Sequence, residues 1–125
     1  MKISGPVASY ELDRIEPDPS GIVVVALSGE LDVTNADDFL GSLRGLTNRD
    51  VPVVLDLSRL VFIDSTAIHH LFRIAEGRDR NSLAFVVEPA ATVAATLEIV
   101  GLDRAAPVLP SLDAAKALLS DANSP

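Results

Sequence analysis

Apolar residues along the chain recur with two different spacings, which predict alternating strands and helices. Apolar runs occupy residues 22–27, 53–57 (interrupted only by Asp56) and 83–87, and such runs are typical of strands in a parallel sheet covered on both faces. Between and after them, apolar residues recur at helical spacing. The predicted helices cover residues 36–47, 65–77 and 90–100, and a last one begins at residue 112.

Both ends of the chain predict further short strands. Residues 7–15 alternate weakly between apolar and polar side chains, and the segment that follows, to residue 21, contains two prolines and a glycine. We therefore expect residues 7–15 to form an edge strand that pairs antiparallel with the strand at 22–27. Residues 105–109 predict a short last strand, and residues 1–6 are expected to fray.

The order of these elements predicts the class of fold. Strands alternate with helices, so βαβ units with right-handed crossovers are expected. We predict an α/β fold in a single domain over residues 1–125, with a core of about residues 7–119 and loose termini. Its central sheet is mostly parallel, with an antiparallel N-terminal edge strand and about four helices. The sequence contains no repeat, low-complexity tract or linker that would divide it.

The junction between the strand from residue 53 and the helix at 65–77 carries the candidate chemistry. Asp64 is predicted to cap this helix by accepting the N–H of Thr66 or Ala67. Ser65 and Thr66 then lie beside free N–H groups at the positive end of the helix dipole, which can accommodate a phosphate. Taken alone, the three residues Asp64, Ser65 and Thr66 are also an ordinary helix start.

Three other helix ends have recognisable signals. Thr34 or Asn35 is expected to cap the helix at 36–47. Gly101 and the leucine after it fit a stop for the helix at 90–100, in which the leucine packs back on the helix. Ser111 is expected to cap the last helix.

Charge and composition exclude several classes of partner. The chain has 18 Asp and Glu against 10 Lys and Arg, a net charge of -8, and its basic residues are scattered. Nucleic acid and anionic membrane surfaces are therefore not expected as partners, whereas a protein with a basic face would be attracted. No apolar run approaches the roughly 20 residues of a membrane span. The absence of cysteine and of a secretory signal favours the cytoplasm.

Catalytic and metal sites lack essential parts in this sequence. A nucleophilic Ser65 would need a base, and His69 lies four residues further on, but the G-x-S-x-G elbow is absent and no third group orients the histidine. His69 and His70 point about 100° apart on a helix, so they cannot easily bind one ion. We expect no catalytic residue, metal or cofactor, and a small serine hydrolase remains an alternative.

Two stretches together resemble the signatures of a known family. They are LSGELD at residues 27–32 and VLDLSRLVFIDST at residues 54–66, and Gly101 with its leucine fits the same pattern. From about residue 7 to 119 the chain resembles a STAS domain, most closely the bacterial anti-sigma factor antagonists. This resemblance implies a switch protein. The unmodified antagonist binds an anti-sigma factor, which is also its serine kinase, and so frees a sigma factor.

In that family, phosphorylation of the serine that follows the aspartate weakens the binding, and a phosphatase restores it. The resemblance therefore implies phosphorylation of Ser65, with Thr66 as the lesser candidate. It implies a partner-binding surface made of Glu30, Asp32, Asp64, Ser65, Thr66, Ala67 and His69.

The chain departs from the family pattern after the serine. Typical members have glycine where Ala67 stands, and commonly Gly-Leu-Gly at 67–69, so a methyl group and an imidazole are expected on the face that a kinase approaches. An alternative function is a non-switching STAS adaptor in a stable complex, for example in lipid transport or a stress-signalling assembly.

Overall fold

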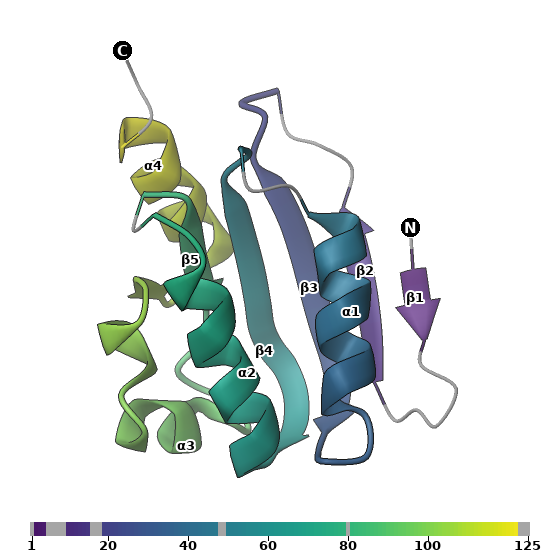
Figure 1. The fold of residues 1–125 in the computed structure, drawn as a ribbon. Helices are drawn as coiled ribbons and strands as arrows, with labels where there is room; N and C mark the ends of the chain where they lie inside the picture. Colours follow the sequence, from purple (N-terminus) through teal and green to yellow (C-terminus); the bar gives the residue numbers. More distant parts are fainter. Residues whose placement is uncertain (1, 5–9, 16–18, 48–49, 80, 123–125) are drawn as a thin grey trace.

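The strands of this chain form one sheet, and the computed structural model describes residues 2–4, 10–15, 19–47, 50–79 and 81–122 (Figure 1). Within these residues, six strands lie in the sheet in their order along the chain: β1 (Lys2–Ser4), β2 (Tyr10–Ile15), β3 (Val23–Leu31), β4 (Val53–Ile63), β5 (Leu83–Val86) and β6 (Val108–Leu109). The helices are α1 (Ala36–Leu46), α2 (Ser65–Glu76), α3 (Ala94–Ile99) and α4 (Leu112–Ala122), with a 3-10 turn η1 (Leu102–Arg104). The predicted α/β fold is confirmed.

The N-terminal strands pair antiparallel and all later pairs are parallel. The predicted antiparallel pairing of β2 with β3 is therefore confirmed, although residues 16–18 of the expected turn lie outside the described residues. The prediction that residues 1–6 fray is wrong for residues 2–4. They form β1, in which Lys2 lies opposite Asp13, so β1 and not β2 is the edge of the sheet.

Helices cover the two faces of the sheet unequally. Figure 1 shows α1 and α2 side by side over one face, where they bury Phe39, Leu43, Leu71 and other apolar residues against the strands. Successive strand residues point to opposite faces, so the alternate residues of β3, β4 and β5 reach a second cluster on the other side. That cluster comprises Ile22, Val24, Val54, Ala84, Val86 and, from α4, Ala115 and Leu119.

Several elements differ in length from their predicted ranges. β3 continues four residues past residue 27, to Leu31, and β6 is limited to Val108–Leu109. β4 continues from the apolar run at 53–57 to Ile63, and its second half alternates irregularly between buried and exposed side chains. It was not predicted as strand because half of its residues there face solvent. α3 begins at Ala94 instead of residue 90, and it ends as predicted before Gly101. The Gly101 N–H donates to the Glu98 carbonyl at 3.0 Å, and its left-handed backbone (φ 74°) turns the following chain out of the helix.

A few apolar side chains of the helical segments are more exposed than helical spacing predicts. That spacing puts Val100 and Leu118 on buried faces, but both are more than a third exposed. Ile68 and Phe72 of α2 are only partly buried, although they pack against the core. The fully buried residues of α2 are Ala67, His70, Leu71 and Ala75.

Candidate functional site

The carboxyl ends of β3 and β4 lie next to each other and bring two distant segments together. In the parallel pairing, Glu30 lies opposite Phe62 and Leu31 opposite Ile63. The loop from β3 to α1 and the start of α2 therefore meet at the same end of the sheet, the lower end in Figure 1. Ligand and partner sites in open α/β sheets favour this end.

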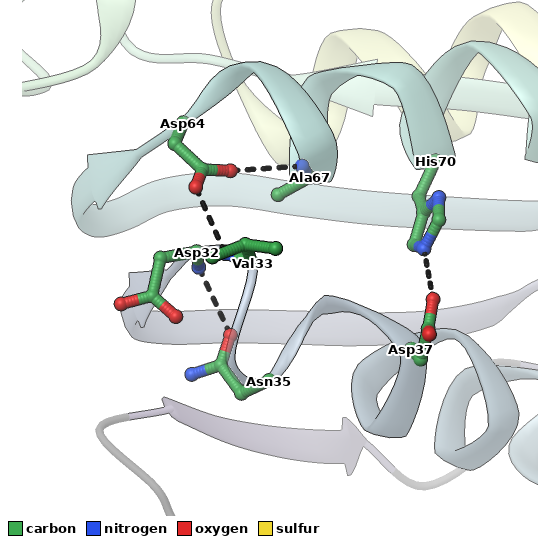
Figure 2. Close-up of polar contacts among 7 residues, drawn as sticks. All are labelled: Asp32, Val33, Asn35, Asp37, Asp64, Ala67 and His70. Atoms are coloured by element: carbon green, nitrogen blue, oxygen red, sulfur yellow. Dashed lines mark hydrogen bonds and ion pairs between the residues drawn. The ribbon is translucent and has the colours of Figure 1, made fainter.

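Asp64 joins the two segments through both oxygens of its carboxylate. One oxygen (Oδ1) accepts the N–H of Ala67 at 3.1 Å and so caps α2, as predicted from the sequence. The other (Oδ2) accepts the N–H of Val33 in the β3–α1 loop at 2.8 Å, as Figure 2 shows. The backbone N–H of Asp64 also donates to the Leu31 carbonyl at 3.0 Å. A single residue thereby holds the loop against the helix start.

Asn35 orders the β3–α1 loop from inside. Its side chain is buried, its Oδ1 accepts the N–H of Asp32 at 3.0 Å, and its Nδ2 donates to the Glu30 carbonyl at 3.0 Å. Asn35 occupies the N-cap position of α1, but its side chain makes no capping hydrogen bond. The predicted cap by Thr34 or Asn35 is therefore wrong, because both side chains are used within the loop instead.

Asp32 is the second carboxylate of this loop. The Thr34 hydroxyl donates to it, and so does the Thr34 N–H at 2.8 Å. These hydrogen bonds, the hydroxyl first, lower the pKa of Asp32 below the ordinary carboxyl value. With Glu30, which is exposed, Asp32 gives this end of the sheet a negative charge at neutral pH.

The predicted site residues on α2 have different exposures. Ser65 is exposed as the first residue of α2, Thr66 is half-buried and His69 is exposed. Ala67 is fully buried in the core. The expectation that its methyl group lies on the approached face is therefore wrong, since only the imidazole of His69 is on the surface.

Three exposed apolar side chains lie close in the chain to residues of this site, and they were not predicted. Val33 is 69% exposed, Val61 55% and Phe62 47%. Val33 lies in the β3–α1 loop next to Asp32. Val61 and Phe62 lie near the carboxyl end of β4, two or three residues before Asp64. The signal in the sequence was the irregular second half of β4, where apolar residues occur outside the buried pattern.

His70 links α2 to α1. It is buried, and its Nε2 lies 2.8 Å from Oδ1 of Asp37 in the first turn of α1 (Figure 2). Within the described residues, no hydrogen bond joins Ser65 to either histidine. The parts of a nucleophilic serine are thus not brought together by these side chains.

Two further features bear on the kind of site. Among the described side chains, no three His, Cys, Asp or Glu residues come together in a way that could hold a metal ion. In the same part of the chain, no helix reaches the length and apolar character that crossing a bilayer requires.

The family of the chain follows from its sequence and its fold together. The family model of the STAS domain matches residues 16–115, which include β3, β4, α2 and the Asp64 junction. The chain belongs to the STAS domain family. No curated protein sequence matches this STAS domain.

Solved structures give further relatives of this STAS domain. An anti-sigma factor antagonist from Mycobacterium paratuberculosis is 26% identical, with a TM-score of 0.73, over 94% of this chain and 98% of its own. The anti-sigma factor antagonist SpoIIAA in its unphosphorylated form is 17% identical, with a TM-score of 0.61, over 86% and 95%. Part of a murine transporter shares the fold as well. It is the anion transporter Solute Carrier 26 family member A9, inward-facing, with 20% identity and a TM-score of 0.66 over 82% of this chain and 18% of the transporter.

Proposed function

We propose that this STAS domain protein is a cytoplasmic, non-enzymatic anti-sigma factor antagonist that is switched by phosphorylation of Ser65. In this proposal the unphosphorylated form binds an anti-sigma factor, which is also its serine kinase, and releases a sigma factor. A phosphatase would reverse the modification. The observation that carries the proposal is the exposure of Ser65 directly beside the junction that Asp64 holds together. The likeness in sequence and fold to an anti-sigma factor antagonist supports it.

The surface around Ser65 has the composition of a protein-docking site. Val33, Val61 and Phe62 provide exposed apolar area, and Glu30 and Asp32 add carboxylates beside it. Protein interfaces commonly combine an apolar centre with a polar rim, and aromatic residues contribute much of the binding energy. The partner that fits this surface has an apolar patch next to basic side chains.

A phosphate on Ser65 would act on the partner more than on the fold. It adds about 1.5 to 2 negative charges at neutral pH. The side chain of Ser65 is exposed, so water continues to solvate the phosphate in the free protein. Both Asp64 oxygens are held by backbone N–H groups, so this carboxylate cannot easily turn away from a phosphate beside it. In a docked complex these charges would lose water and repel acidic groups, which costs binding energy.

The modification is tested by incubating the protein with ATP and candidate anti-sigma kinases, followed by mass spectrometry of the peptide that contains Ser65. We expect one phosphate that disappears in Ser65→Ala and persists in Thr66→Ala. Absence of phosphate with every kinase, together with a constitutive complex, would instead support the non-switching adaptor. Ester turnover that is lost in Ser65→Ala would support the hydrolase.

The switch itself is tested with a charge mimic. Ser65→Glu is expected to weaken binding to the anti-sigma factor by at least tenfold while the melting temperature changes little. Ala117→Glu is the matched control, because it adds the same charge at an exposed position of α4, away from the site. Unfolding of Ser65→Glu, or equal loss of binding in both variants, would contradict the proposal.

A further inference from the structure

A mostly apolar pocket lies beside the edge strand β6, between α3, η1 and the end of β5. It has a volume of about 470 Å³, within the roughly 300–1,000 Å³ that small-molecule sites cover. Six of the eight described residues that line it are apolar, namely Val87, Pro89, Ala94, Leu97, Leu102 and Val108. None of the lining residues belongs to the surface proposed around Ser65.

The floor of this pocket is part of the core. Leu97 and Leu102 are almost fully buried, Val87 is buried as well, and all three belong to the same core cluster. Side chains that core packing holds in place keep their arrangement without a ligand. They also offer no hydrogen bonds to water in the pocket. An apolar group that displaces this water is therefore favoured.

The two remaining residues that line the pocket are acidic. Glu98 is on α3 and Asp103 is on η1, and both are exposed. Within the described part of the chain, neither carboxylate accepts a hydrogen bond or forms an ion pair. Arg104, the next residue after Asp103, does not line the pocket, and its side chain lies against Gly101 instead.

Helix dipoles do not explain these two charges. Glu98 is in the last turn of α3, where the free carbonyls act as a partial negative charge and an acidic side chain is unfavourable. That turn contains no basic residue. Asp103 lies in η1, whose three residues are too few for a sizeable dipole. The pocket therefore combines an apolar floor with negative charge that no residue lining it balances.

We propose that this pocket binds a small amphipathic amine, in which a primary ammonium group is carried on an aliphatic or aromatic body. The ammonium pairs with Glu98 and Asp103, and the body lies against Leu97 and Leu102. A neutral ligand lacks the ion pairs, and an anionic ligand is repelled. Another pocket, of about 310 Å³, is lined by three arginines near the ends of α1 and α2 and should exclude the same amine. The site is independent of the function proposed for Ser65.

The binding test is an NMR titration of the methyl signals of the whole chain with phenethylamine. We expect a Kd of roughly millimolar for a ligand of this size. Shifts should centre on Val87, Leu97 and Leu102, and the affinity should fall as salt is added. 2-Phenylethanol, in which a hydroxyl replaces the ammonium, should bind at least about fivefold more weakly. Phenylacetate, which carries the opposite charge, should not bind measurably.

Variants separate the charge of the pocket from its shape. Glu98→Gln and Asp103→Asn should each weaken phenethylamine binding by about two- to fivefold, and the double variant should bind it no more tightly than 2-phenylethanol. Glu76→Gln is the matched control, because Glu76 is likewise an exposed glutamate in the last turn of a helix and does not line the pocket. Ala94→Leu, which fills the pocket from α3, should weaken binding of both compounds. Ser65→Ala should bind as the wild type does.

Any of four results would overturn this inference. They are unchanged methyl signals of the pocket at about ten times the expected Kd, equal affinity for phenethylamine and 2-phenylethanol, an equal loss of affinity in Glu76→Gln, and shifts that centre on the arginine-lined pocket or on Ser65. Melting curves show whether a variant loses binding for a structural reason. Glu98→Gln should not lower the Tm, since it removes a charge that the helix end disfavours, so its loss of affinity reports on the ligand alone.

Discussion

Replacement of Asp64 by alanine is expected to destabilise the protein through two lost hydrogen bonds. The bond from Ala67 N–H is an N-cap, which is worth about 1 kcal/mol. The bond from Val33 N–H is exposed to solvent, so we assign it about 0.5–1 kcal/mol. The free energy of unfolding should therefore fall by about 1.5–2 kcal/mol. For a domain of this size, that corresponds to a decrease in Tm of roughly 5–10 °C.

Urea unfolding followed by circular dichroism measures this loss, and two further variants define its origin. Asp64→Asn keeps one accepting oxygen and should lose about half as much, because its amide nitrogen cannot accept a hydrogen bond. Asp103→Ala is the control, since Asp103 is exposed and its carboxylate accepts no hydrogen bond within the described residues. Amide exchange at Val33 should become faster in Asp64→Ala. A loss below about 0.5 kcal/mol, or unchanged exchange at Val33, would refute the reasoning.

Three further predictions concern the loop, the core and the helix ends. Thr34→Val should raise the pKa of Asp32 toward its ordinary value, as measured by carboxyl carbon NMR. Since the Thr34 hydroxyl favours the ionised form of Asp32 in the folded protein, this stabilisation is present above the ordinary pKa value of 3.8 and is lost as the pH falls through the lowered pKa. Phe39→Ala should cost about 3–5 kcal/mol in urea unfolding, because Phe39 is fully buried and packs edge-to-face on Tyr10; a loss below about 1 kcal/mol would contradict this packing. Gly101→Ala should lower the free energy of unfolding by about 1–2 kcal/mol, because Gly101 has a positive φ. Gly41→Ala should raise it by about 0.5–1 kcal/mol, because Gly41 lies within α1 and a methyl group there meets open space. Equal effects of the two variants in urea unfolding would contradict the left-handed backbone at Gly101.

The sequence predicted what depends on neighbouring residues. The three central strands, the four helices and the capping of α2 by Asp64 each follow from a short pattern of apolar residues or from one side chain at a helix start. Ser111 was predicted in the same way, and its hydroxyl does accept the N–H of Ala114 at 3.1 Å.

Features that depend on distant segments were missed. β1 has three residues, too few for a pattern, and exists through its pairing with β2. The inward hydrogen bonds of Asn35 depend on how the loop closes, so its position at a helix start misled the capping prediction. The burial of Ala67 was missed because it depends on which face of α2 packs against the sheet, and that face includes Ala67. Arg44 and Arg73 looked scattered along the chain, yet the packing of α1 on α2 places them at one pocket.

The two outer strands of the sheet limit how another chain can associate with this protein. β1 has three residues and β6 has two, and a long unpaired strand edge is what allows another polypeptide to extend a sheet. Edges this short offer few free backbone groups for such an extension. As far as the chain is described, strand-by-strand association at these two margins is therefore unfavourable, and another chain would form its contacts mainly with side chains.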